Sequence, residues 1–459
     1  MKNLKKEKRR KARKITLLTI LVVVAGIVAY NMISGYLDTL PKIHYDCYSG
    51  QQQAAVYPDA GFAVISDLHF YDTSLGSEGA AFEEVLYSDR KLLLDSEALL
   101  DYTIDGLLGA DLEFVLVSGD LTKDGELLNH ERVAAKLQRL LDAGIRVFVV
   151  PGNHDVNNPD AVRFDGDETW PVDNISADDF ARIYENMGYG DAFLRDDASL
   201  NYAAEPVDGL WIVAVDNCRS YENVPGVEET VGGRLRQEQE EWLADLLGQA
   251  AEQGKAVIIL THHGLMEHWD GQSKLHPDYI VEDFKHVGEF LASYHVKLGF
   301  SGHYHAQDVT RAEFDGNVLY DVETGSLVTA PCPIRYCDIR DGVLTIRTNT
   351  IVDNIYPGTD FAENAQKFVK DTVMLEAHKT LKKYKASDAD ADYIADAVGD
   401  AFNAHYSGDE DESLKPDFDT GELGLWGKII FSTQKYVVNG LWVDLLPADN
   451  DVVIDLNQG

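Results

Sequence analysis

Short apolar segments alternate with longer amphipathic segments between residues 60 and 301. Six apolar runs of four to six residues, rich in β-branched side chains, begin at Phe62, Phe114, Val147, Leu210, Ala256 and Val296. Nearly continuous apolar character is typical of strands that are buried on both faces. We therefore expect these six runs to be strands of buried sheets.

Several of the stretches between these runs are amphipathic and long enough to be helices. Three of them span residues 96–109, 129–144 and 237–254. The third ends in Gly254, a residue type that commonly terminates helices. Alternation of strands and helices predicts an α/β architecture in which helices pack over sheets.

The pattern changes near Tyr356-Pro357-Gly358. Before this point, residues 311–354 predict further strands, and after it residues 361–385 and 389–406 predict two helices. The last forty residues are mixed, with apolar pieces but no clear period. We expect a main domain over residues 60–355 and a mainly helical C-terminal appendage over residues 360–459, whose role the sequence does not reveal.

The N-terminal end has a different character from the rest of the chain. Residues 1–14 contain nine Lys or Arg residues and one acidic residue, and residues 15–37 contain no charged residue. An apolar run of this length can cross a bilayer as a helix. No A-x-A pattern follows it, so an uncleaved anchor fits better than a signal peptide. The expectation is a cytoplasmic segment 1–14, a transmembrane anchor 15–37, a stalk 38–59 and an extracytoplasmic main domain.

The chain is strongly acidic. It carries a net charge of −38, and because residues 1–14 carry +8, the remainder carries −46. Such a surface repels nucleic acid and anionic lipid, so binding of a nucleic-acid duplex is not expected. It also repels a phosphate substrate at long range. Bound metal cations would supply the positive charge that attracts such a substrate at the site itself.

Only four cysteines are present, and none forms a C-x-x-C motif. Four are too few for a disulfide scaffold in a chain of 459 residues. Cys332 and Cys337 are close enough in sequence to pair across a short loop in an oxidising compartment. The sequence leaves open whether they do.

Residue types that bind metal ions follow five of the six predicted strands. They are Asp67 and His69, Asp120, Asn153 and His154, the pair His262-His263, and finally His303 and His305. Sites in α/β sheets gather at the carboxyl ends of strands, where loops bring distant residues together. Five strand ends that each offer carboxylate, amide or imidazole groups are hard to explain by packing, and they predict a metal site.

The same blocks occur in the order of a known family. D-x-H, GD, GNHD, a His after a strand and GHxH together resemble the calcineurin-like metallophosphoesterases over roughly residues 60–345. The longer stretches GNHDVNNP, THHGLMEHW, SGHYHAQD and TGSLVTAPCPIRY resemble a membrane-anchored bacterial subgroup. The resemblance implies a β-sandwich flanked by helices (αββα) and hydrolysis of phosphate esters.

The resemblance also implies a centre of two metal ions. Asp67, His69 and His305 would bind the first ion, Asn153, His262 and His303 the second, and Asp120 would bridge both. His263 remains an alternative to His262, because neighbours on a strand point to opposite faces. Iron, manganese and zinc all suit this mixture of nitrogen and oxygen ligands.

The mechanism implied by such a centre is attack on phosphorus by a hydroxide that the two metals activate. His154 would not bind metal but would act as an acid near the leaving group. Asn158, Glu267 and His268 are candidates for the substrate cleft.

We expect a phosphodiester to be preferred slightly over a monoester. The alternatives are a lipid-headgroup phosphatase or pyrophosphatase, and a non-catalytic binding protein at the cell surface that uses the same fold. Intact ligand blocks and an intact His154 argue against the binding protein, because binding alone needs no proton donor.

Overall fold

The computed structural model describes residues 43–50 and 55–458, and the described residues from Tyr45 onward form one compact unit. The expected basic segment and transmembrane anchor, residues 1–37, lie outside the described residues. Within the described part, no helix is both long and apolar enough to cross a membrane.

The unit is built on two mixed β-sheets. The first contains, in spatial order, β15 (Asp451–Asp455), β14 (Val343–Thr350), β13 (Pro333–Arg340), β1 (Ala60–Ile65), β2 (Phe114–Val117) and β3 (Arg146–Val149). The second contains β11 (Asp308–Phe314), β12 (Asn317–Glu323), β10 (Leu298–Ser301), β9 (Ala256–Thr261), β8 (Leu210–Val215), β7 (Tyr202–Val207) and β6 (Leu194–Arg195). All six predicted runs are strands, and the expected α/β architecture is confirmed. A separate hairpin joins β4 (Val162–Asp165) and β5 (Glu168–Pro171).

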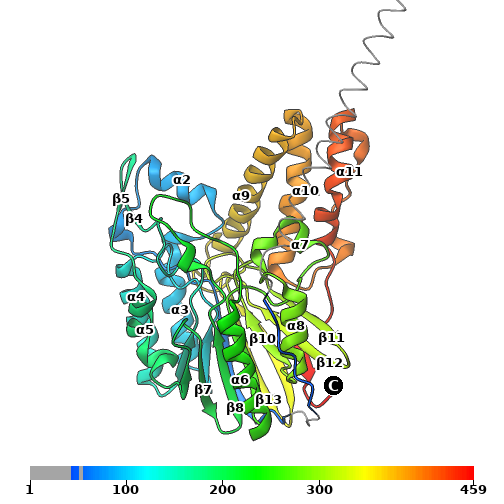
Figure 1. Cartoon of the computed structure of the whole chain (residues 1–459). Coiled ribbons are helices and arrows are strands. Elements are labelled where there is room, and N and C mark those ends of the chain that lie inside the picture. Colours follow the sequence, from blue (N-terminus) through cyan, green and yellow to red (C-terminus); the bar gives the residue numbers. More distant parts are fainter. Residues whose placement is uncertain (1–42, 51–54, 459) are drawn as a thin grey trace, which may run out of the picture. The chain divides into compact units, whose positions relative to one another are not determined.

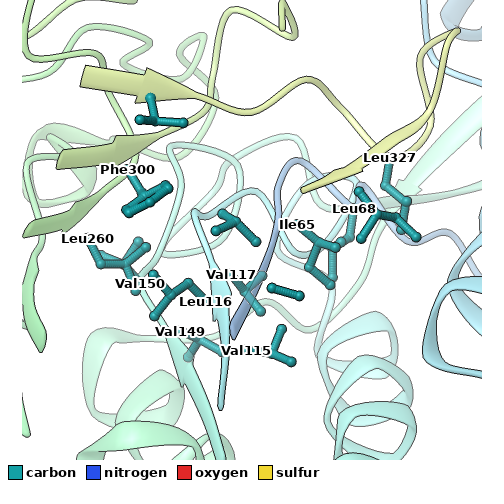
Figure 2. Packing of buried hydrophobic residues seen from close by; sticks show 14 of the residues in the cluster. Ile65, Leu68, Val115, Leu116, Val117, Val149, Val150, Leu260, Phe300 and Leu327 are labelled. Atoms are coloured by element: carbon teal, nitrogen blue, oxygen red, sulfur yellow. The ribbon is translucent and has the colours of Figure 1, made fainter. Parts of the chain in front are cut away.

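The core lies between the two sheets. Phe62 of β1 meets Phe300 of β10 edge to face, with 5.6 Å between the ring centroids. Figure 2 shows aliphatic side chains of this core, among them Leu116 of β2, Val149 of β3 and Leu260 of β9. All of these side chains are fully buried, and each contributes roughly 1.5–3 kcal/mol of burial free energy. Because both faces of the central strands are covered, their sequences lack the polar alternation of half-exposed strands.

Helices cover the outer faces of both sheets (Figure 1). α3 (Ser96–Leu108) and α4 (Leu127–Asp142) lie on the first sheet, and α6 (Gln237–Gln253) and α8 (Phe284–Ser293) lie on the second. α6 ends where the sequence predicted, because Gly254 adopts a left-handed φ of 67° and stops the helix. Shorter helices occur in the connections, namely α2 (Ala80–Ser88), α5 (Ala177–Ile183) and α7 (Gln272–Leu275).

The C-terminal residues form three helices and one strand. α9 (Phe361–Lys383), α10 (Asp388–Ser407) and α11 (Leu425–Gly440) stand next to one another in Figure 1. The chain then returns to the first sheet as β15, which pairs antiparallel with β14. Residues after 360 therefore belong to the same compact unit as the two sheets. All four cysteines have free thiols, and those of Cys332 and Cys337 are buried.

Candidate dinuclear metal centre

The metal-ligand residue types gather at the carboxyl ends of the parallel strands. Asp67 follows β1 and Asp120 follows β2, and the backbone N–H of His69 donates to the carbonyl oxygen of Asp120 at 2.9 Å. Five non-glycine residues here have a positive φ between 35° and 74°, namely Asp67, His69, Asp120, His303 and His305. Each such conformation costs on the order of 1–3 kcal/mol and is typical of functional sites.

The first group of potential ligands is fully buried. It consists of Asp67, His69, Asp120 and His305, with one ligand atom from each within 4.8 Å of the others. The Nε2 atom of His69 lies 3.5 Å from Oδ2 of Asp120, and Nε2 of His305 lies 3.3 Å from Oδ1 of Asp67. Ligands that are each about 2.0–2.2 Å from one ion are separated by this kind of distance. The four side chains therefore fit a metal ion.

The second group shares Asp120 with the first. It contains Asp120, His262 and His303, and Oδ1 of Asn153 lies 3.2 Å from Nε2 of His262. The Nδ1–H of His262 donates to the carbonyl oxygen of Ser118 at 2.8 Å, which leaves the lone pair of Nε2 for an ion. One carboxylate common to two ligand groups is what a bridged pair of metals requires.

The two adjacent histidines have different surroundings. Nδ1 of His263 lies 3.0 Å from Oδ1 of Asn217, and its Nε2 lies 2.7 Å from the carbonyl oxygen of Val231. Both ring nitrogens of His263 are thus engaged by other groups. Nε2 of His262 lies 3.4 Å from Oδ2 of Asp120, so the geometry favours His262 as the ligand.

The electrostatics of these rings suit a cation. Burial, together with the charge of Lys91, holds the pKa of His69 well below its ordinary value, so this ring is neutral and its lone pair is free. Burial also lowers the pKa of His262, but the Asp120 carboxylate outweighs it and raises the pKa to about 9. Asp120 thus attracts a positive charge to this position, and a metal dication supplies that charge in place of the proton.

His154 lies beside the ligand groups but joins neither. Its Nδ1–H donates to Oδ1 of Asp124 at 2.9 Å, and its Nε2 lies 3.5 Å from Oε1 of Glu229. Burial alone would lower the pKa of His154, but Glu229, Asp120 and Asp124 together raise it to about 10 despite the opposing charge of Lys91. These carboxylates favour the protonated form of His154, the form that a proton donor needs.

A small pocket of about 130 Å³ opens onto the ligand groups. Its lining is mostly polar and includes Lys91, His154, Glu229 and Tyr279. The ammonium of Lys91 is buried, 2.8 Å from Asp89 and 3.4 Å from Nε2 of His154. Burial lowers the pKa of Lys91, but Asp89 and Asp120 outweigh it and raise the pKa, so the pocket contains a fixed positive charge.

The three cleft candidates lie in different places. Asn158 is buried and donates to Oε2 of Glu229 at 2.5 Å, so it holds a residue that lines the pocket. His268 does not reach the pocket, because it is buried between Asp308 and Asp321 at 2.7 and 3.1 Å. Glu267 accepts a hydrogen bond from the backbone of Ser273 and does not line the pocket either.

Sequence reasoning missed three residues around His154. Lys91 is one of 40 Lys and Arg residues and no motif marks it, and Asp124 follows the GD block by four residues. Glu229 comes from a loop with no motif and is brought to His154 by the fold alone. Loop residues of this kind carry no local pattern that could reveal them.

Comparison with known families agrees with this geometry. A model of the calcineurin-like phosphoesterases matches residues 61–307, more than half of the chain. The chain belongs to this family, and it is a phosphoric ester hydrolase. The family and the two ligand groups indicate a dinuclear metal site.

Solved structures similar to the chain include two phosphatases. A dimetal phosphatase from Danio rerio is 17% identical, with a TM-score of 0.47, and the match covers 64% of this chain and 96% of that one. A purple acid phosphatase from yellow lupin seeds is 13% identical, with a TM-score of 0.38, and the match covers 67% of this chain and 53% of that one. No curated protein matches the sequence significantly.

Proposed function

We propose that this protein hydrolyses phosphodiesters at a centre of two metal ions. The observation that supports this most is the shared carboxylate of Asp120, which joins two buried ligand groups beside a protonated histidine. The proposed ligands are Asp67, His69, Asp120, Asn153, His262, His303 and His305. When bound, the two ions supply Lewis-acid stabilisation of phosphoryl oxygens and lower the pKa of a water molecule.

The residues of the pocket supply the remaining chemistry. His154 carries a proton on Nε2 that it can give to the departing alkoxide, and Asp124 fixes the ring by accepting from Nδ1–H. Glu229 stabilises the protonated form of His154. The ammonium of Lys91 reaches the same space and attracts the anionic phosphoryl group.

Charge favours a diester over a monoester. A phosphomonoester carries about −1.5 to −2 charges near neutral pH, whereas a diester carries a single negative charge. The chain has a net charge of −38, and Asp89, Asp120 and Glu229 line the pocket itself. Arg90, Lys91 and His154 balance these three carboxylates inside the pocket, so it is the long-range field of the acidic chain that opposes the second negative charge of a monoester.

The same pocket argues against the two alternatives. Val231 is the only aliphatic residue among the described residues that line it, and a lipid headgroup enzyme would be expected to offer an apolar path for the acyl chains. A binding protein would have no use for the carboxylates that keep His154 protonated. Both observations favour hydrolysis of a polar, water-soluble ester.

We also propose that the enzyme acts on the outer face of a membrane. The nine cations of residues 1–14 next to the uncharged run 15–37 support this orientation. Protease added to intact cells should then cleave the domain after residue 37, while residues 1–14 stay protected. Protection of the domain until the cells are lysed would refute the proposal.

The enzyme assay uses the full-length chain purified in detergent with added Mn²⁺. We expect turnover of bis-p-nitrophenyl phosphate to exceed that of p-nitrophenyl phosphate, and Asp120→Asn to abolish both. Asp315→Asn is a matched control, because Asp315 has the same φ of 50° as Asp120 but is exposed in a turn. Equal activity of Asp120→Asn and wild type would contradict the proposed centre, and faster monoester turnover would contradict the diester preference.

A further inference from the structure

A second group of metal-ligand side chains lies where α10 meets β11. Asp308 begins β11, His405 lies in the last turns of α10, and Glu410 follows that helix in a loop. One nitrogen of His405 and one oxygen each from Asp308 and Glu410 lie within 4.8 Å of one another. The three side chains are all about 1% exposed. None of them belongs to the dinuclear centre.

Three of the buried polar atoms in this group lack hydrogen-bond partners among the described residues. Oδ1 of Asp308 accepts from Nδ1 of His268 at 2.7 Å, and Oε1 of Glu410 accepts from Nδ1 of His405 at 2.5 Å. The other three polar atoms, Oδ2 of Asp308, Nε2 of His405 and Oε2 of Glu410, have no partner among the described residues. Buried polar atoms without partners are rare in folded proteins, and each calls for an explanation such as a bound ion.

His268 supplies one positive charge to Asp308, but Asp321 and Glu323 share that charge. Burial lowers the pKa of the His268 ring, but the nearby carboxylates outweigh it and raise the pKa. The guanidinium of Arg335 lies nearby, but it donates to the backbone carbonyl oxygens of Asp449 and Glu323 at 2.5 and 2.6 Å. Within the described part of the chain, Glu410 forms an ion pair only with His405. Buried carboxylates that lack a counter-charge cost several kcal/mol, so a cation would stabilise this arrangement.

We propose that Asp308, His405 and Glu410 bind a third divalent metal ion, with Zn²⁺ as the preferred ion. One imidazole and two carboxylates are a common ligand set for Zn²⁺, which accepts three protein ligands and a water. Ca²⁺ prefers six to eight oxygen ligands and rarely binds an imidazole nitrogen. A cleft of about 390 Å³ reaches Glu410 and gives the ion a path from solvent.

This ion would connect the C-terminal helices to the catalytic pocket. Asp308 lies three residues after the metal ligand His305, on the strand that continues from it. The ring of His405 lies 5.6 Å from that of Tyr304, which lines the pocket. A metal at this position fixes the end of α10 against β11 and so supports one wall of the pocket.

Metal content tests the proposal directly. The full-length chain in detergent is saturated with Zn²⁺, dialysed, and analysed for zinc per chain by inductively coupled plasma mass spectrometry. We expect three equivalents in wild type and one fewer in both Glu410→Gln and His405→Gln. The matched control is Glu412→Gln, an exposed glutamate two residues along the same loop, which should bind as much zinc as wild type.

The outcome separates this site from the dinuclear centre. Asp120→Asn should lose zinc from the active site alone, and adding Glu410→Gln to it should remove one further equivalent. An unchanged zinc content in both Glu410→Gln and His405→Gln would overturn the proposal, whatever the total in wild type. The two glutamine variants differ in which ligand they remove, so misfolding of one leaves the other as a test.

Discussion

The Nε2 atoms of His69 and His305 face each other at 3.1 Å in the buried centre. Two ring nitrogens this close either share one proton or direct two lone pairs at one ion. Oδ1 of Asp67 lies 3.3 Å from the His305 nitrogen, so a carboxylate already points to the same place. Because burial keeps the pKa of His69 well below its ordinary value, a proton is poorly held there and a metal ion is the better occupant.

Replacing His154 by glutamine should slow hydrolysis most for substrates whose leaving group must be protonated as it departs. General acid catalysis contributes about 10²–10⁴-fold, so we expect a loss of this size for an alkyl phosphodiester. The p-nitrophenolate group leaves without protonation, so turnover of bis-p-nitrophenyl phosphate should fall much less. Steady-state kinetics on both substrates measures the difference. An equal loss on the two substrates would show that His154 does not donate a proton.

Removing the charge of Glu229 should move the pH profile. Glu229 lies 3.5 Å from Nε2 of His154 and is the strongest of the groups that raise its pKa. In Glu229→Gln the protonated form of His154 is less stable, so the alkaline limb of kcat against pH should shift to lower pH by about one unit or more.

The control for this shift is Glu228→Gln, the preceding residue, which makes no ion pair within the described residues. It should leave the alkaline limb in place. A limb that does not move in Glu229→Gln, or that moves to higher pH, would contradict the assignment of that limb to His154.

Much of the fold and most of the proposed ligands could be predicted because their signals are local. For example, an apolar run followed directly by Asp67 and His69 predicts both a buried strand and a metal site within a few residues. The choice between His262 and His263 could not be made this way. It depends on Asn217 and Val231, which come from distant loops and engage only His263.

Nearness in sequence to a proposed ligand does not predict which residues line the pocket. His268 follows the proposed ligand His262 by six residues, yet its side chain packs between Asp308 and Asp321 and not in the pocket. The last forty residues are mixed in the sequence, yet residues 425–440 form the single helix α11, although its β-branched residues have a weak intrinsic preference for helix. Tertiary packing of its apolar face overrides these weak local preferences.

His130 should make the protein sensitive to acid. It is buried on α4, and burial lowers its pKa from 6.5 to about 3, so the folded state holds it neutral. Below its unfolded pKa the unfolded chain gains a proton that the folded chain does not. Stability is therefore lost as pH falls from about 6.5 toward 3. The loss from this one residue should reach about 2 kcal/mol at about pH 5.

Urea unfolding at several pH values, with a chelator present, measures this effect. His130→Gln should be less stable than wild type near neutral pH, because it loses hydrogen bonds to Tyr184 and Asp155, but its stability should fall less on acidification. The exposed His286→Gln is the control and should retain the wild-type slope. Identical slopes for His130→Gln and wild type would show that His130 is not held neutral.

Gly119 is a position where one added methyl group should disturb the metal centre. It precedes Asp120, has a φ of 95°, and a Cβ placed on it would lie 2.5 Å from Nδ1 of the proposed ligand His262. Gly119→Ala must therefore displace either the backbone beside Asp120 or the ring of His262. We expect weaker metal binding and a loss of activity of about 10²-fold, as for a small misplacement of catalytic groups.

Gly119→Ala also strains the backbone, because alanine disfavours a positive φ. A control must therefore introduce the same strain without the contact with His262. Gly144 ends the turn after α4 with a similar φ of 86°, and a Cβ there would meet nothing within 4 Å. Gly144→Ala should lower stability by about 1 kcal/mol and leave activity and metal content unchanged. If instead both variants lose activity equally, strain and not the contact with His262 would be the cause. Loss in Gly119→Ala alone, reversed in part by excess Mn²⁺, would tie the effect to the position of His262.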